Sequence, residues 1–135
     1  MPPRQSFDEV MAQARAGLSA MIRRKDAAGM AAFRSVMAAL DNACAVPPPE
    51  PPAGTAAEGI ALAVPFGTAE VPRRQVSPDE VDHILSAEIT MRTEQATALD
   101  QAQRDLDAAL ARYQAALLTR LRDGQVLGAL PSRPR

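Results

Sequence analysis

Apolar residues recur every three or four positions over the first part of the chain, which is the spacing of one helix face. The residues on this face are Phe7, Val10, Met11, Ala14, Leu18, Met21 and Ile22. Ser6 precedes them and Glu9 follows it by three positions, an arrangement typical of a capping box at a helix start. The pattern therefore predicts a helix over roughly residues 7–24.

A second helical pattern follows after a very short polar interval. Its predicted apolar face comprises Met30, Phe33, Met37, Leu40 and Cys44. Asp26 is a suitable N-cap for this helix. Because only Arg, Lys and Asp separate the two patterns, we expect residues 6–44 to fold back as an antiparallel helical hairpin.

The stretch "SPDE", residues 77–80, repeats the start signal. Ser77 can cap, Pro78 fits the first helical position, and Glu80 closes the capping box. The apolar face of this third helix contains Val81, Ile84, Leu85 and Ile89. Glu88 and Arg92, four positions apart, are expected to pair on its wetter side.

A further face continues toward Gly124, a favourable residue for a helix stop. Its members are Leu99, Ala102, Leu106, Leu110, Tyr113, Leu117 and Leu121. Asp100 and Arg104 have the spacing of another helical ion pair. Neither Gly nor Pro marks a turn between Glu94 and Arg104, so one long helix and two helices both remain open. Residues 77–124 form the second predicted hairpin.

No helical pattern exists over residues 45–76, where the run "AVPPPEPPAGTAAEG" concentrates five prolines. We expect a Pro/Ala-rich linker with polyproline character, the alternative being a proline motif docked on an aromatic groove of a partner. Residues 60–66 are the one stretch where a strand or a buried clip could form. Residues 1–5 and 125–135 are predicted to be disordered. The predicted fold is an all-α four-helix bundle built of two hairpins.

Charge is divided unevenly between the two hairpins. The net charge is -1 and the pI is near 5.8, whereas a general nucleic-acid binder has a basic footprint. Residues 1–44 hold six Lys/Arg and four Asp/Glu, while residues 77–123 hold five and nine. We therefore expect a weak, salt-dependent attraction between the hairpins.

Composition limits the chemistry available to the chain. Cys44 is the only cysteine, so no internal disulfide can form and a reducing, cytoplasmic setting is expected. The sequence shows no signal peptide and no apolar run long enough to span a membrane. No catalytic, metal-binding or cofactor-binding motif is evident, and neither is a site for a small-molecule substrate.

The basic run Arg23, Arg24 and Lys25 is the main candidate for a functional surface. Together with Arg34 and Arg92 it could bind phosphates or a partner, if the hairpins pack antiparallel. The alternative is structural, because cations at the end of a helix complement its dipole. Arg34 could instead bridge to Glu88 or Glu94 of the second hairpin.

Two single residues have both a functional and a structural interpretation. His83 lies near Asp79 and Glu80 and could form half of a metal site or an acid–base pair, but a surface histidine is the commoner case. Cys44 could be a reactive thiol, although at the end of an apolar stripe it is expected to be a small buried side chain.

The chain resembles the YqeY family, relatives of the C-terminal region of the GatB subunit of glutamine-dependent tRNA amidotransferases. Residues 18–43, "LSAMIRRKDAAGMAAFRSVMAALDNA", look like the opening hairpin of that family's N-terminal helical domain. Residues 77–94, "SPDEVDHILSAEITMRTE", are similar to its third helix, and residues 102–106, "AQRDL", to the turn into the fourth. Gln103 stands where the family commonly turns with glycine.

The resemblance implies a GatB/YqeY-like helical module linked to carbon–nitrogen ligation with glutamine as amido donor. Its partners would be tRNA or an amidotransferase- or translation-related protein. Because no nucleophile with its base can be recognised, we expect a non-catalytic accessory role. The alternatives are a homodimeric helical adaptor without a nucleic-acid role and, less in keeping with these residues, an enzyme.

Overall fold

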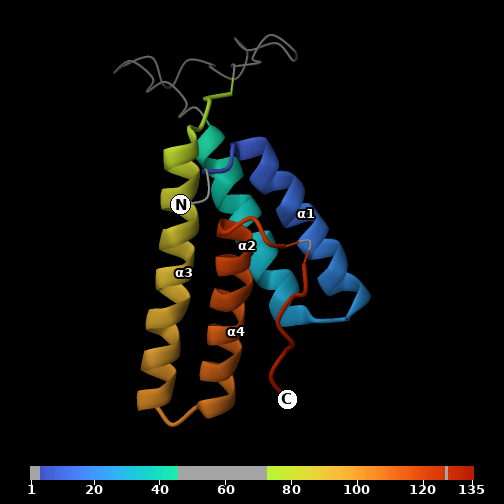
Figure 1. The fold of residues 1–135 in the computed structure, drawn as a ribbon. Coiled ribbons are helices and arrows are strands. Elements are labelled where there is room, and N and C mark those ends of the chain that lie inside the picture. The colour runs from blue at the N-terminus through green and yellow to red at the C-terminus, as the bar shows by residue number, and fades with distance from the viewer. Residues whose placement is uncertain (1–3, 46–72, 127) are drawn as a thin grey trace, which may run out of the picture.

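Four α-helices form the body of the protein in a computed structural model that describes residues 4–45, 73–126 and 128–135 (Figure 1). They are α1 (Phe7–Arg23), α2 (Ala27–Cys44), α3 (Pro78–Gln101) and α4 (Asp105–Arg122). Those three ranges contain no β-strand. The all-α prediction is therefore confirmed. Most of the predicted linker, including the possible strand at residues 60–66, lies outside the described residues.

Polar caps begin the first three helices, as the sequence predicts. The side chain of Ser6 accepts a hydrogen bond from the Glu9 amide at 3.2 Å, and Ser77 accepts one from the Glu80 amide at 3.2 Å. Asp26 accepts in the same way from the Gly29 amide at 3.0 Å. Each cap satisfies an amide that has no partner within its own helix.

Left-handed residues end α1, α3 and α4. Lys25 has φ 55°, Gln103 has φ 59° and Gly124 has φ 73°. After each, the next amide bonds back to a carbonyl in the last helical turn, as in Arg104 N to Leu99 O at 2.9 Å, which is the Schellman arrangement. The question left open by the sequence is thereby answered, because the chain turns at Gln103 and forms two helices.

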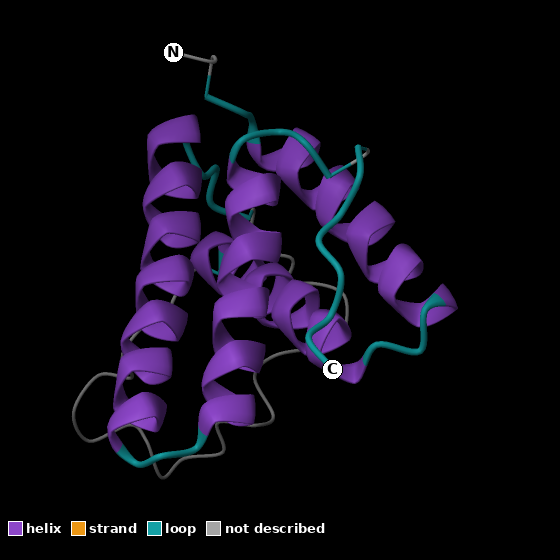
Figure 2. Cartoon of the chain, turned by 60° about the horizontal axis from the view of Figure 1, so that its bottom comes forward, coloured by secondary structure: helices purple, strands orange, loops and turns teal. Residues whose placement is uncertain are grey.

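The helices pack as two antiparallel hairpins, α1 with α2 and α3 with α4, and α2 contacts all three other helices (Figure 2). A Cβ atom at Gly17 would lie 2.5 Å from the ring of Phe33, so glycine lets α1 approach α2 closely. Most predicted apolar positions lie in one core. Its fully buried large side chains are Val10, Met21, Phe33, Val36, Leu40, Val81, Leu85, Leu117, Leu118 and Leu121.

Three residues predicted to face the core are instead exposed. Ile22 is 51% exposed in the last turn of α1, and Leu106 is 56% exposed at the start of α4. Ala102 is also exposed. The tip of the α3–α4 hairpin extends beyond the α1–α2 corner in Figure 1, so the helices of the first hairpin do not cover this end of the second.

Residues 73–76, at the end of the predicted linker, contact the end of α2. The Arg74 amide donates to the Cys44 carbonyl at 3.0 Å, and the Arg74 guanidinium lies 2.6 Å from the Glu80 carboxylate. Val76 is buried. The chain thus leaves and rejoins the bundle at adjacent points. No helix within the described part of the chain is long and apolar enough to cross a membrane.

Candidate functional site

The basic corner, defined as Arg23, Arg24 and Lys25, lies at the turn between α1 and α2, and all three side chains are exposed. None of them forms an ion pair with a carboxylate in the described ranges. Nη1 of Arg24 donates to the carbonyl of Pro131 at 3.2 Å. The three positive charges therefore remain available to an external anion, at the negative end of the α1 dipole.

Buried polar contacts fix the backbone of this corner. Asp26 is 3% exposed and accepts from the Gly29 amide and from the hydroxyl of Tyr113 in α4. A Cβ atom at Gly29 would lie 2.2 Å from the Met21 sulfur, so only glycine fits there without a shift. Asp26 thus caps α2 and also ties the corner to the second hairpin.

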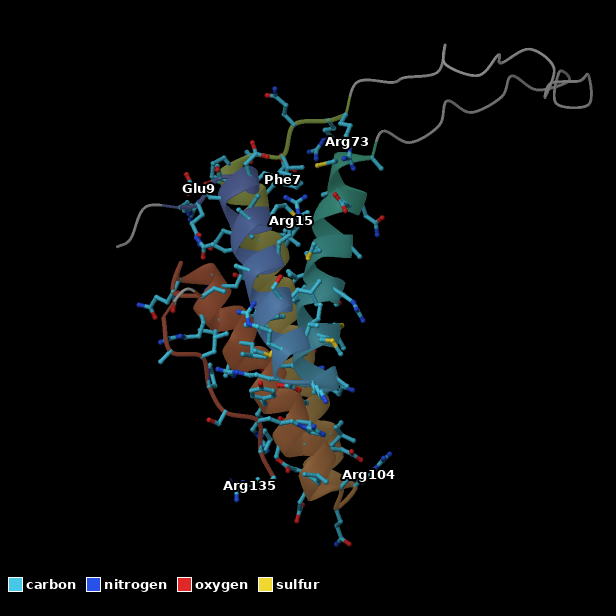
Figure 3. All side chains as sticks on the ribbon, turned by 90° about the vertical axis from the view of Figure 1, so that its right-hand side faces the viewer. Phe7, Glu9, Arg15, Arg73, Arg104 and Arg135 are labelled. Atoms are coloured by element: carbon cyan, nitrogen blue, oxygen red, sulfur yellow. The ribbon has the colours of Figure 1, made fainter. Side chains whose placement is uncertain are left out.

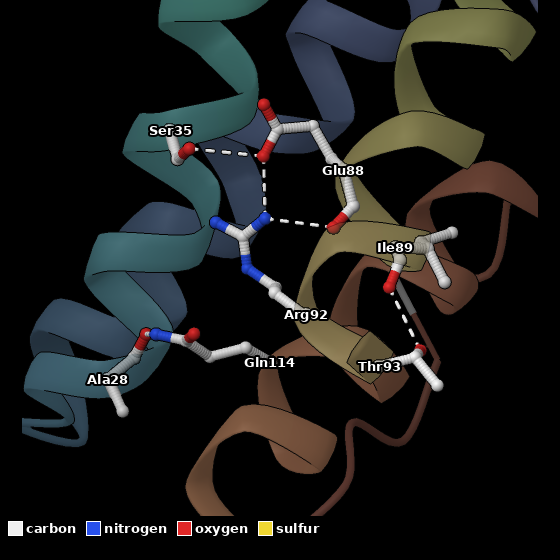
Figure 4. Close-up of polar contacts among 7 residues, drawn as sticks. All are labelled: Ala28, Ser35, Glu88, Ile89, Arg92, Thr93 and Gln114. Carbon is white, nitrogen blue, oxygen red and sulfur yellow. Dashed lines mark hydrogen bonds and ion pairs between the residues drawn. The ribbon is translucent and has the colours of Figure 1, made fainter. Parts of the chain in front are cut away.

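The environment of Tyr113 keeps its hydroxyl protonated. Burial and, next, the hydrogen bond to Asp26 together raise the pKa of Tyr113 to about 12, while nearby Arg24 opposes the change. Tyr113 therefore remains a donor to Asp26 throughout the physiological range. Gln114 adds a second link, since its amide donates to the Ala28 carbonyl in the first turn of α2 at 2.9 Å (Figure 4).

Arg34 is exposed on α2 and stays outside any ion pair among the residues described. The bridge from Arg34 to Glu88 or Glu94, one of its two predicted roles, is not formed. Glu88 instead binds Arg92 at 2.5 Å and accepts from the Ser35 hydroxyl at 3.1 Å. Arg34 therefore remains a free cation, though it lies two turns of α2 away from the basic corner.

Arg92 does not join the basic corner, which corrects the sequence prediction. It is 5% exposed, and its Nη1 donates to the Glu88 carboxylate and, at 3.0 Å, to the Glu88 carbonyl (Figure 4). The expectation that this pair lies on the wetter side of α3 is also wrong. This side of α3 faces α2, where Ser35 supplies a third polar partner.

The predicted pair of Asp100 with Arg104 is likewise wrong, because the helix ends between them. Asp100 pairs with Arg112 across the α3–α4 turn, and Arg104 pairs with Asp107 at 2.5 Å within the start of α4. The Arg112 guanidinium lowers the pKa of Asp100 from its ordinary value. These exposed pairs hold the tip of the second hairpin and leave its arginines engaged.

The segment after α4 brings two cations that sequence reasoning missed. Arg133 and Arg135 are exposed, and Figure 3 shows Arg135 beyond the α1–α2 corner, at about the height of Arg104 in the α3–α4 turn. The stretch "GALPSRPR" has no apolar period. Only its pair of arginines could have drawn attention to it.

The remaining candidates do not form a reactive centre. His83 is exposed and Cys44 is buried, as the commoner interpretation of each predicts. Among the described residues, no group of three His, Cys, Asp or Glu side chains could hold a metal ion. An open hollow of about 470 Å³ lies beside Cys44, Phe7, Arg73 and Val76. Arg73 there is paired with Asp41 at 3.5 Å.

Comparison with known proteins adds no relative. No family model matches the chain, and no curated protein and no solved structure is similar to it. The resemblance to the YqeY family therefore stays an expectation that depends on the sequence motifs alone.

Proposed function

We propose that this protein is a non-catalytic helical module that binds the phosphate backbone of RNA through its basic corner. The observation that carries the proposal is that Arg23, Arg24 and Lys25 are consecutive, exposed and free of carboxylate partners in the part of the chain that the structure describes. Cations in this state gain free energy by displacing the counterions of a nucleic acid.

The rigidity of the corner supports the proposal. Asp26 is held by two donors, one from α2 and one from α4, and Lys25 is fixed in a left-handed conformation. The backbone that carries the three cations is therefore set before any ligand arrives. A preorganised surface loses less conformational entropy on binding than a mobile one does.

Contacts to phosphate, and not to bases, fit the side chains available. The aromatic side chains of the described residues, Phe7, Phe33 and Tyr113, all belong to the core or pack against it. Among the described residues, no exposed aromatic ring is therefore present at the corner on which a base could stack. Phosphate contacts fix position without reading sequence, so the shape of a folded RNA would be recognised. Transfer RNA is the class to which the family resemblance points.

The test is the binding of fluorescently labelled total transfer RNA at about 150 mM salt, followed by fluorescence anisotropy. We expect Arg23→Gln with Arg24→Gln to weaken binding by about tenfold or more, with a shallower dependence on salt. The matched control is Arg15→Gln with Arg73→Gln, which removes two positive charges away from the basic corner, one from the middle of α1 and one from the segment before α3 (Figure 3). Equal loss in both variants, or no binding by the unaltered protein, would overturn the proposal.

The homodimeric adaptor remains the alternative, and one observation limits it. The apolar faces that could have formed a dimer seam are buried within a single chain. The large apolar residues exposed in the described ranges, Ile22, Met91 and Leu106, lie on three different helices. Sedimentation of the same samples decides between the two functions. A mass that doubles with concentration, without any RNA binding, would favour the adaptor.

A further inference from the structure

The segment after α4 is held against the bundle by several contacts, one of which comes from Arg24 of the basic corner. Val126 is 4% exposed and belongs to the core, and Leu130 packs against that core. Nη2 of Arg120 donates to the Ala129 carbonyl at 2.5 Å, and Nη1 of Arg24 donates to the Pro131 carbonyl at 3.2 Å. We call residues 128–135 the tail.

Arg120 is the first of the two tethers. Its Nη1 also donates to the Gln125 side chain at 3.2 Å, so one guanidinium holds the turn after α4 and the tail together. A Cβ atom at Gly128 would lie 3.3 Å from Nη2 of Arg120, so a small residue there leaves room for the guanidinium. Both tethers bind backbone carbonyls, which fixes the path of the tail and not merely one of its side chains.

The path of the tail ends with two further cations. Arg133 and Arg135 are exposed, and neither is paired with any carboxylate that the structure describes. Arg133 is only two residues beyond the carbonyl that Arg24 holds. The acid nearest in sequence to the basic corner, Asp26, is buried and already accepts two hydrogen bonds.

We propose that the tail extends the phosphate-binding surface from Arg23, Arg24 and Lys25 toward Arg133 and Arg135, with Arg120 as the positioning residue. The RNA ligand of this surface rests on the proposed function, whereas the joining of tail and corner rests on the contacts alone. A surface of five cations made from segments more than a hundred positions apart exists only in the folded protein.

The charge of the tail is tested with Arg133→Gln together with Arg135→Gln. Both side chains are exposed, so the fold should be unchanged by circular dichroism. We expect binding of a short inorganic polyphosphate chain and of total transfer RNA to weaken by about 20-fold at ~150 mM salt. The salt slope should become shallower by about 1.5, because two phosphate contacts are lost. Arg15→Gln with Arg73→Gln serves again as the control of equal charge.

The placement of the tail is tested with Arg120→Leu. This change removes the first of the two tethers and leaves Arg24, Arg133 and Arg135 in the chain. We expect backbone nitrogen relaxation to show rapid motion of residues 129–135, and both probes to bind several-fold more weakly than they bind Arg73→Gln, which also lacks one charge. Tail motion equal to that of the unaltered protein, or binding equal to that of Arg73→Gln, would overturn the positioning role.

The two probes separate failure of the inference from failure of the proposed function. Polyphosphate binding that depends on the tail, without transfer RNA binding, would keep the joined surface and refute the RNA role. Transfer RNA binding that depends on Arg23 and Arg24 but not on the tail would keep the RNA role and refute the joined surface. If neither polyphosphate nor transfer RNA binds, the joined surface and the RNA role are both refuted.

Discussion

A buried hydrogen bond, donated by the Tyr113 hydroxyl to the Asp26 carboxylate, joins the two hairpins. The buried carboxylate is tolerable because the Gly29 amide and the Tyr113 hydroxyl both donate to it. Sequence reasoning identified Asp26 as a helix cap and Tyr113 as a core residue, and both are correct. Their contact could not be predicted, because it depends on how the second hairpin docks on the first.

The pKa of Tyr113 gives the first prediction. Tyr113 is the only tyrosine in the chain, so the ultraviolet absorbance of tyrosinate reports it alone. We expect the native protein to titrate near 12, where burial has raised the pKa, and the urea-unfolded protein to titrate near 10.

The stability of the fold should follow this shift in pKa. Because the folded pKa is the higher one, the contribution of Tyr113 is complete below pH 10 and is lost as the pH rises from about 10 to about 12. Tyr113→Phe should abolish that part of the pH dependence in urea unfolding. A native tyrosine that titrates near 10 would contradict both expectations.

The buried pair of Arg92 and Glu88 gives the second prediction. Arg92→Met leaves the Glu88 carboxylate at the α2–α3 interface without its cation, so the free energy of unfolding should fall by about 3–5 kcal/mol. Glu88→Leu together with Arg92→Met removes both charges and should recover most of that loss. Urea denaturation measures both variants.

A matched pair at the surface serves as the control for this prediction. Arg104 and Asp107 form an exposed pair of the same kind, and Arg104→Met should cost less than about 1 kcal/mol. A similar small cost for Arg92→Met would mean that Glu88 finds water or another donor when Arg92 is lost. Such a result would contradict the exclusion of water from the α2–α3 interface around Glu88.

At the scale of elements, the helix starts were predictable and one helix end was not. Ser6, Asp26 and Ser77 act through a side chain and an amide three positions away, so the start signal is local and readable. The end of α3 depends on Gln103 taking a left-handed conformation with φ 59°. Glutamine carries no signal for that conformation, so the pattern left one helix and two helices equally open.

The third prediction concerns this turn. Gln103→Gly removes the steric cost of a left-handed conformation for a residue with a Cβ atom, so the free energy of unfolding should rise by about 1 kcal/mol. The matched control is Gln101→Gly, two positions earlier in the last turn of α3, which should lower it by about 1 kcal/mol.

Thermal or urea unfolding of the two variants tests the prediction, and their opposite signs make it specific. Equal destabilisation by both changes would mean that Gln103 makes contacts worth more than the strain of its backbone.

For the whole molecule, the pattern of apolar residues was sufficient to predict the architecture. It was not sufficient to predict which charged side chains are exposed. The apolar periods of residues 7–44 and 77–121 specify which faces meet, and the two hairpins follow. Whether a cation is exposed depends on what packs against it. Arg92 and Arg34 look alike in sequence, yet the first faces α2 and is buried while the second faces away from the core. The tail was missed because its tethers come from Arg24 and Arg120, which lie on other elements.

The fourth prediction tests whether the two hairpins suffice for the fold. The core residues of the described ranges lie in residues 7–44 and 76–130, and Arg74 bonds directly to Cys44. Replacing residues 46–72 with about four Gly/Ser residues should therefore preserve cooperative unfolding and raise its free energy by about 1–2 kcal/mol, through a smaller loop-closure cost. Urea denaturation measures both quantities. Loss of a cooperative transition would show that the core requires the replaced segment.

The bond between the Arg74 amide and the Cys44 carbonyl also makes the only thiol of the chain a reporter of local opening. Cys44 is 6% exposed at the closed end of α2, so an alkylating reagent should reach its sulfur only while this junction is open. The ratio of the modification rate of Cys44 to that of a free thiol would then give the fraction of time for which this junction is open. The native sequence thus already carries a chemical probe for the opening of this junction.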